Sequence, residues 1–197
     1  MKVIIVGAGW AGCAAAVAAA KNGADVTLCE RTDMPLGTGL VGGIMRNNGR
    51  FTAAEEAIAL GGGDLFAITD ANCRHKNVDF PGHKHASLYD IAKTPMAVQR
   101  HLEKLSIRLL FEHRITKVRM TKDAIAAVQA DNGSWLAGDV FVDTTGTAGP
   151  MNNCAQYGNG CAMCVLRCPS YGGRVSLAAL AGVAELQSKR PDGQPGP

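Results

Sequence analysis

The stretch KVIIVGAGWAG, residues 2–12, places an apolar run directly before three glycines in the order Gly-x-Gly-x-x-Gly. Its first five residues are rich in β-branched side chains, which is typical of a buried parallel strand. The Ala-rich residues 13–21 predict a helix that ends near Gly23. Residues 24–30 (ADVTLCE) predict a second strand. The N-terminus therefore predicts one β–α–β unit.

This context gives the three glycines a specific interpretation. Gly7 permits a tight turn, Gly9 lets the backbone approach a pyrophosphate, and Gly12 lets the helix pack closely on the strand. The N–H groups at the start of the helix would bind the phosphates. Glu30, at the end of the second strand, would accept hydrogen bonds from the ribose hydroxyls. An α/β core without a nucleotide is the alternative, and we predict a bound dinucleotide.

Three segments in residues 1–150 resemble the FAD-dependent oxidoreductases with the glutathione-reductase-like fold. The opening stretch 2–31 resembles the first nucleotide-binding unit of that family. GTGLVGGI (37–44) is similar to its glycine-rich loop close to the flavin, and DVFVDTTGTAG (139–149) to its strand and Thr-Gly turn near the ADP half. The resemblance implies FAD as the cofactor. It implies the following cofactor-binding residues: Gly7, Ala8, Gly9, Trp10, Ala11, Gly12, Glu30, Arg31, Gly37, Thr38, Gly42, Gly43, Thr145 and Gly146.

The expected fold class is α/β, with a Rossmann-like parallel sheet, an inserted α+β segment and a Cys-rich C-terminal extension. The FAD-binding domain is expected to span residues 1–150, with the insertion at about 45–95. Within this domain we expect a loop over 31–50, a helix opened by a capping box at Thr52 and Glu55, and irregular structure over 72–90. Two further parts follow: a cluster-binding segment, 151–185, and a disordered tail, 186–197.

Four cysteines lie close together after residue 150. Cys161, Cys164 and Cys168-Pro169 reproduce the last three cysteines and the proline of a bacterial ferredoxin-type ligand run. Gly158 stands where the first cysteine of that run would be, and Cys154 lies four residues earlier. Four thiolates could hold a [4Fe–4S] cluster or a zinc ion, or the thiols could stay unligated. Beside a flavin a cluster can carry electrons, and we therefore favour iron–sulfur.

Candidates for catalysis are few. His83 and His85 follow the turn-forming pair Pro81-Gly82, and they could ligate a metal or act as acid and base on a substrate. Histidines on the surface of a polar loop are the commoner outcome. Arg46 follows the glycine-rich loop and is a candidate by position alone.

The family normally returns to the nucleotide domain with a Gly-Asp motif near the C-terminus, and no such strand-Gly-Asp element follows residue 150. Either the chain is a fragment, or a second polypeptide completes the flavin and substrate site, and we favour the second interpretation. The resulting hypothesis is an FAD-binding subunit of a dehydrogenase that passes electrons from a small organic substrate to the iron–sulfur cluster. The alternatives are a non-catalytic electron-transfer or assembly subunit, and an NAD-binding Rossmann protein with structural zinc.

Composition excludes several other classes. The formal net charge is +3 with scattered charges, which argues against a nucleic-acid or membrane-surface partner. The sequence has 7 cysteines, and we interpret them as reduced thiols in a cytoplasmic protein. Three glycines interrupt the apolar N-terminus, so we do not interpret it as a signal peptide.

Overall fold

A computed structural model describes residues 1–46, 50–147, 168–185 and 191–193. The predicted β–α–β unit is confirmed at its N-terminus. β1 (Lys2–Val6) and β2 (Asp25–Cys29) are parallel neighbours, and α1 (Trp10–Lys21) connects them. Gly23 follows the helix with a φ of +79°, a left-handed conformation that glycine adopts without strain.

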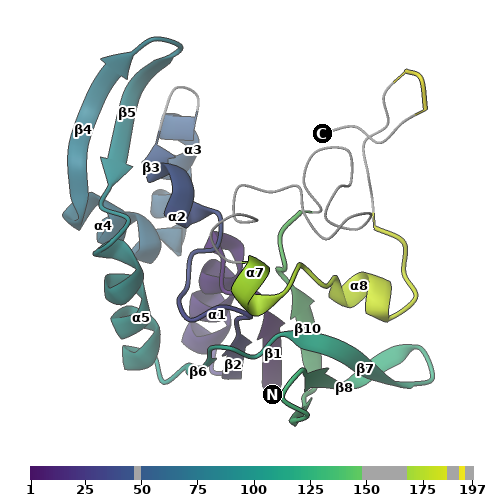
Figure 1. The fold of residues 1–197 in the computed structure, drawn as a ribbon. Coiled ribbons are helices and arrows are strands. Elements are labelled where there is room, and N and C mark those ends of the chain that lie inside the picture. Colours follow the sequence, from purple (N-terminus) through teal and green to yellow (C-terminus); the bar gives the residue numbers. More distant parts are fainter. Residues whose placement is uncertain (47–49, 148–167, 186–190, 194–197) are drawn as a thin grey trace.

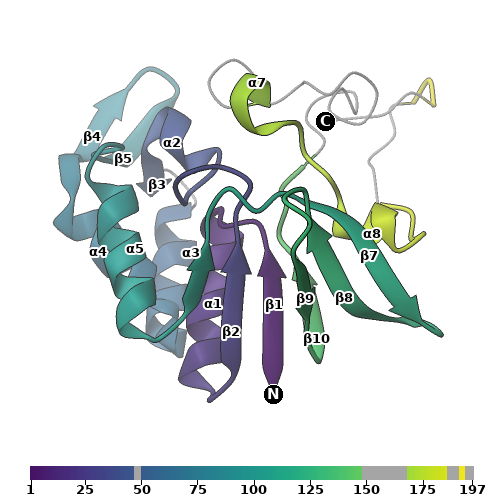
Figure 2. The ribbon, with the colours of Figure 1, turned by 60° about the horizontal axis from the view of Figure 1, so that its bottom comes forward.

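β1 lies inside a four-stranded sheet of order β10-β1-β2-β6. β10 (Val140–Asp143) pairs with β1, and β6 (Arg108–Leu110) pairs with β2. Each of the three pairings is parallel, so the carboxyl ends of the strands lie at one edge of the sheet (Figure 2). The Rossmann-like α/β fold class expected from the sequence is confirmed.

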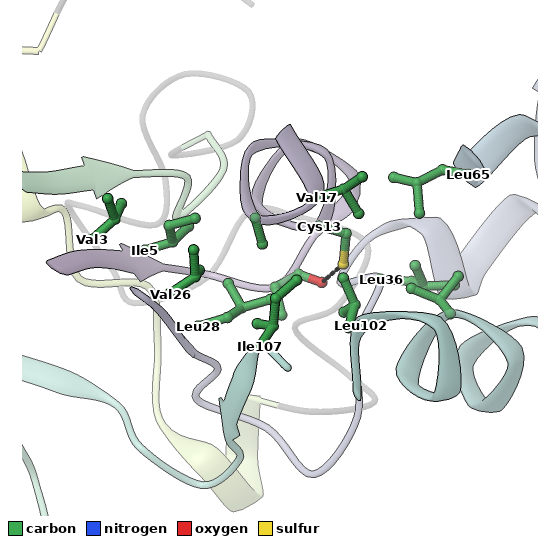
Figure 3. Packing of buried hydrophobic residues seen from close by; sticks show 13 residues of the cluster. Val3, Ile5, Cys13, Val17, Val26, Leu28, Leu36, Leu65, Leu102 and Ile107 are labelled. Carbon is green, nitrogen blue, oxygen red and sulfur yellow. Dashed lines mark hydrogen bonds between the residues drawn. The ribbon is translucent and has the colours of Figure 1, made fainter. Parts of the chain in front are cut away.

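Both faces of the parallel sheet are covered, and this is why β1 is an unbroken apolar run. Val3 and Ile5 point to one face, where they belong to a core cluster with residues of α1 and α5 (Thr94–Lys104) (Figure 3). Ile4 and Val6 point to the opposite face and belong to a second core cluster. A strand buried on only one face would have alternated apolar with polar residues.

An antiparallel sheet covers this second face. It consists of β7 (Ile115–Thr121), β8 (Ala124–Ala130) and β9 (Trp135–Ala137), in that order. Val128 of β8 is fully buried there, and α8 (Leu177–Leu180) contributes its first residue to the same cluster. The polypeptide near the C-terminus therefore packs on the same core as the N-terminal strand.

The segment after β2 contains more regular structure than we expected. α2 (Gly39–Gly42) and β3 (Ile44–Arg46) lie within residues 31–50, which were predicted to be a loop. α3 (Arg50–Ala57) begins two residues before Thr52, so the predicted capping box does not start this helix. Each of these elements is only three or four residues long, too short to produce a recognisable apolar pattern. The glycine-rich sequence therefore gave no sign of them.

The prediction of irregular structure over residues 72–90 was wrong. After the π-helical turn η1 (Ile58–Gly62) and α4 (Asp64–Ala71), β4 (Cys73–Phe80) and β5 (His83–Tyr89) form a hairpin. They make an antiparallel sheet of order β3-β5-β4, and the hairpin extends away from the parallel sheet (Figure 1). Most described side chains of β4 are exposed, so no apolar alternation marks the strand in the sequence.

Two short helices lie beyond the carboxyl edge of the parallel sheet. α7 (Cys168–Tyr171) faces the strand ends in Figure 2, and α8 follows it. Among the described residues, no helix is both long and apolar enough to cross a membrane.

The substitution Gly12→Ala tests the packing of α1 on β1. A Cβ atom at Gly12 would lie 1.8 Å from the carbonyl oxygen of Gly7, a contact that requires the backbone to move. Overpacking of this kind costs about 3 kcal/mol, of which the higher helix propensity of alanine recovers about 1 kcal/mol. We expect the free energy of unfolding, measured by urea denaturation, to fall by about 2 kcal/mol or more.

Gly63→Ala is the control, because Gly63 stands at the start of another helix, as the N-cap residue of α4, has a negative φ, and its Cβ would meet Ile58 at an ordinary 3.4 Å. We expect it to cost less than about 1 kcal/mol. Equal losses in the two variants would contradict the proposed role of close packing at Gly12.

Candidate functional site

A cleft lies at the carboxyl edge of the parallel sheet, where β1, β2 and β10 end. Ligands of open parallel α/β sheets bind at this edge. The cleft has a volume of about 220 Å³, whereas a complete ligand pocket typically has roughly 300–1,000 Å³. The described walls therefore suit one half of a dinucleotide.

The structure brings together most of the residues that the resemblance implied as cofactor-binding. Those that line the cleft are Gly7, Gly9, Glu30, Arg31, Gly37, Thr38, Thr145 and Gly146. Outside the lining lie Ala8, Trp10, Ala11, Gly12, Gly42 and Gly43. Sequence reasoning missed further lining residues, among them His113, Arg114, Arg174 and Val175. No local motif surrounds these four, so only the fold could reveal them.

Gly7 and Gly12 hold the strand–helix turn against β10. Gly7 has a φ of +103°, and a Cβ there would lie 2.4 Å from the carbonyl oxygen of Thr144. The Thr144 hydroxyl lies 2.7 Å from the carbonyl oxygen of Gly7, to which it donates. Neither glycine has room for a side chain, because the backbones of two strand ends meet here.

Gly9 has a different role. It is the N-cap residue of α1, no side chain caps the helix at this position, and a Cβ on Gly9 would meet no atom within 4 Å. The N–H groups of the first helical turn have no partner within a helix and attract anions. The packing of the protein therefore does not require a glycine here. A phosphate group that binds the start of the helix would require one, because a side chain would occupy its place.

Glu30 is almost completely buried beside this turn. Its carboxylate accepts hydrogen bonds from the backbone N–H of Ala8 (2.8 Å) and from the N–H and hydroxyl of Thr32 (2.9 and 3.1 Å). A carboxylate has about four lone-pair positions, so one remains for a ligand hydroxyl. The ribose contact stays a prediction, and the structure adds that Glu30 also fixes the glycine turn.

The glycine-rich loop after β2 is joined to the same turn. Leu36, which is fully buried, has a φ of +87° and donates its N–H to the carbonyl oxygen of Ala8 (2.7 Å). Such a conformation costs a non-glycine residue about 1–3 kcal/mol and persists only where its surroundings enforce it. Leu36 forms a β-bridge with Gly9, and Gly37 lies directly beside them on the cleft wall.

Tyr89, at the end of the hairpin, fixes the next part of this loop. Its hydroxyl donates to the carbonyl oxygen of Gly39 (2.6 Å) and accepts the indole N–H of Trp10 (3.1 Å). The two aromatic rings meet edge to face, with centroids 5.6 Å apart. Burial raises the pKa of the Tyr89 phenol, although the Trp10 hydrogen bond partly opposes it. The inserted segment is thereby linked to the start of α1.

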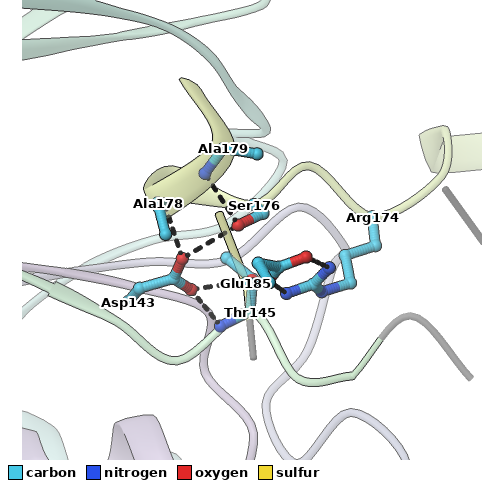
Figure 4. Close-up of polar contacts among 7 residues, drawn as sticks. All are labelled: Asp143, Thr145, Arg174, Ser176, Ala178, Ala179 and Glu185. Carbon is cyan, nitrogen blue, oxygen red and sulfur yellow. Dashed lines mark hydrogen bonds and ion pairs between the residues drawn. The ribbon is translucent and has the colours of Figure 1, made fainter. Parts of the chain in front are cut away.

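Asp143, the last residue of β10, organises the other side of the cleft (Figure 4). One carboxylate oxygen accepts the N–H (2.9 Å) and hydroxyl (2.7 Å) of Thr145, and the other accepts the N–H of Ala178 (3.0 Å). Burial acts to raise the pKa of Asp143, but these donors outweigh it and hold the pKa below its usual range. The carboxylate therefore joins a cleft residue to α8.

None of the candidate catalytic residues is among the described residues that line the cleft. Arg46 lies in β3, and His83 and His85 lie in β5 of the hairpin. The ring of His85 is exposed, and its Nδ1 lies 2.8 Å from the side-chain oxygen of Asn77. The structure places no described side chain of this set against the nucleotide cleft.

Of the four predicted cluster ligands, Cys154, Cys161 and Cys164 lie outside the described residues. Cys168 begins α7, and its sulfur accepts a hydrogen bond of 3.2 Å from the guanidinium of Arg31, a cleft residue. Within the described parts of the chain, no group of three or more His, Cys, Asp and Glu side chains could hold a metal ion.

Fold and cleft together define a dinucleotide-binding α/β protein of the Rossmann type. The model of the family "Glucose inhibited division protein A" (GIDA) matches residues 2–192, and the chain belongs to this family. None of the curated proteins compared with the chain matches it.

Solved structures share the fold. The Diels-Alderase PyrE3 has a TM-score of 0.59 and 18% identity over 95% of this chain, and PqsL from Pseudomonas aeruginosa has 0.56 and 16% over 97%. GidA from Aquifex aeolicus has a TM-score of 0.52 and 20% identity over 72%. The chain spans only 36%, 48% and 24% of the length of these three proteins, respectively.

The two core cysteines near the cleft allow a test by thiol labelling. Burial, and next the negative charge of Glu30, raise the pKa of Cys13 to about 12. Burial likewise raises the pKa of Cys29 to about 12, with Arg108 opposing and Glu30 adding to the effect. Since only the thiolate reacts, we expect iodoacetamide at pH 8 to modify both about a thousandfold more slowly than in urea. Peptide mass spectrometry measures these rates, and fast labelling of the folded protein would contradict the burial of both thiols.

Proposed function

We propose that this chain is the FAD-binding part of a flavin-dependent oxidoreductase. The observation that carries the proposal is the open space at Gly9, where the uncapped start of α1 faces a cleft lined by Glu30 and Thr145. Two structural neighbours add support: PqsL is a probable FAD-dependent monooxygenase, and CtdE (TM-score 0.51, 20% identity) was solved in complex with FAD.

Residues of the cleft divide into two groups for this function. The first turn of α1 would hold the diphosphate, and Glu30 would accept from the adenosine ribose. Gly37 and Thr38, which line the cleft beside Gly9, would lie along the route to the flavin. A bound flavin would accept a hydride from an organic substrate and release the electrons one at a time. The protein contributes binding, orientation and exclusion of water.

Gly9→Ala separates nucleotide binding from folding. The added methyl group meets no protein atom, so we expect the free energy of unfolding to change by less than about 1 kcal/mol. The methyl group would obstruct the diphosphate at the start of α1, and we expect the Kd for FAD to rise at least about tenfold, which corresponds to about 1.4 kcal/mol. Quenching of flavin fluorescence on titration measures the Kd.

Gly63→Ala serves as the control here as well, since it changes an N-cap glycine far from the cleft in sequence and in the fold. It should leave the FAD affinity unchanged. An unaltered affinity in Gly9→Ala, or tight binding of NAD in place of FAD, would contradict the proposed flavin site.

We further propose that Cys154, Cys161, Cys164 and Cys168 hold a [4Fe–4S] cluster that takes electrons from the flavin. The spacing of the last three cysteines supports this, as does the hydrogen bond that keeps Cys168 beside the cleft residue Arg31. A second polypeptide would then complete the flavin and substrate site.

Spectroscopy of the protein purified without oxygen distinguishes the outcomes. A [4Fe–4S] cluster gives broad brown absorbance and about four iron atoms per chain. Cys168→Ser should abolish this absorbance, whereas Cys73→Ser, at a half-exposed cysteine of the hairpin, should retain it. Zinc without iron, or a colourless metal-free protein, contradicts the cluster and leaves the flavin site to be judged by its own titration.

A further inference from the structure

Residues 168–185, which we call the strap, cross the carboxyl edge of the parallel sheet. Arg174 and Val175 of the strap line the same cleft as Gly9 and Glu30. The strap follows the cysteine-rich stretch in the sequence and is far from the nucleotide motif. Residues of the strap nevertheless line the cleft, as residues of the glycine turn do.

Two arginines from the body of the protein hold the first half of the strap. Arg31, directly after β2, donates from one guanidinium nitrogen to the carbonyl oxygen of Gly172 and to the sulfur of Cys168. Arg114, directly before β7, donates to the carbonyl oxygen of Gly173 (2.8 Å). Gly172 has a φ of +78°, and a Cβ there would meet the Arg114 side chain at 2.9 Å.

The second half of the strap is held by the end of β10. Asp143 accepts the N–H of Ala178, and the hydroxyl of Ser176 caps α8 by accepting the N–H of Ala179 (3.1 Å). Leu177 is buried in the second core cluster. Within the strap, Arg174 pairs with Glu185, and this hydrogen-bonded pair lowers the pKa of Glu185 even though burial opposes it.

These anchors are themselves cleft residues or contact them. Arg31 and Arg114 line the cleft, and Asp143 binds Thr145, which also lines it. The hydrogen-bond acceptors of Arg31 and Arg114 in the strap are neutral carbonyl oxygens and a sulfur, so no carboxylate of the strap offsets their charge. Arg31 and Arg114 therefore bring two positive charges to a cleft wall that also carries the carboxylate of Glu30, and they can attract an anionic ligand.

We propose that the strap and a nucleoside diphosphate group in the cleft stabilise each other, and that Ser176 is a positioning residue for this ligand. The inference rests on the proposed function, which places such a group there. A ligand that contacts Arg174 and Arg31 binds the closed strap better than the open one. By thermodynamic linkage, the ligand favours the closed strap by the same factor by which closure tightens ligand binding. A change that lowers the closed population raises the apparent Kd in proportion.

Hydrogen exchange on the full chain tests this coupling, with ADP, FAD and riboflavin as probes. At an ADP concentration of 100 times its Kd, exchange of the strap amides, including Ala178 and Ala179, should slow by up to about a hundredfold. FAD should act in the same way, and riboflavin, which lacks the diphosphate, should have no effect. Peptides of the β7–β8 hairpin around Lys122 provide the internal control.

Ser176→Ala removes the cap of α8 and the hydroxyl that donates to Asp143 (3.5 Å), and Ser176 itself does not line the cleft. We expect it to speed exchange of the strap and to raise the Kd for ADP by about threefold to tenfold, the range of a lost helix cap. Ser87→Ala is matched to it, because Ser87 is equally buried and accepts one backbone N–H (Asn77, 3.3 Å) in the hairpin. The control should leave ADP affinity unchanged.

The outcomes separate the two proposals. If calorimetry detects no ADP binding, the proposed function fails and this inference fails with it. If ADP binds but the strap exchanges as before, or if Ser176→Ala binds ADP as tightly as the unaltered protein, the inference alone is overturned.

Discussion

The structure depends on one close approach of two backbones, between the turn after β1 and the end of β10. Thr144 lies so near Gly7 that no side chain fits between them, and its hydroxyl bonds the carbonyl oxygen of the turn. This contact fixes the start of α1 relative to two strand ends. The carboxylates of Glu30 and Asp143 then hold the neighbouring segments through backbone N–H groups. The cleft exists because these fixed points surround it.

The same logic explains how different parts of the chain come to share one site. Tyr89 joins the inserted segment to the site by hydrogen bonds with the glycine-rich loop and with Trp10. Arg31 joins the strap to the site by its hydrogen bond to Gly172. Two of these links are part-buried hydrogen bonds to backbone carbonyl oxygens, of Gly39 and Gly172, and the third is the bond from the Trp10 indole to the Tyr89 hydroxyl. Such contacts specify position more strictly than apolar packing does, because an unsatisfied partner would be costly.

Local sequence predicted those parts of the fold that local physics determines. The β–α–β unit, the parallel sheet and much of the cleft lining followed from the run before Gly7, the glycine spacing and the position of Glu30. The hairpin was missed because polar residues occupy its exposed faces. Arg114 and Arg174 were missed because only tertiary packing brings them to the strand ends. Leu36 could not be foreseen either, since a left-handed leucine has no signature in sequence.

The position of β1 between β2 and β10 has a consequence for the order of folding. β1 can pair with β2 as soon as residue 29 is made, but its other edge waits for residues 140–143. Ribosomal synthesis of that interval takes on the order of 10 s, during which one edge of the most apolar strand has no partner. The cleft is complete only after β10 and the strap have been made, so the glycine turn is synthesised long before the rest of the cleft that it lines. The long segment between β2 and β10 thus separates in time the synthesis of the glycine turn from the pairing of β1 with β10.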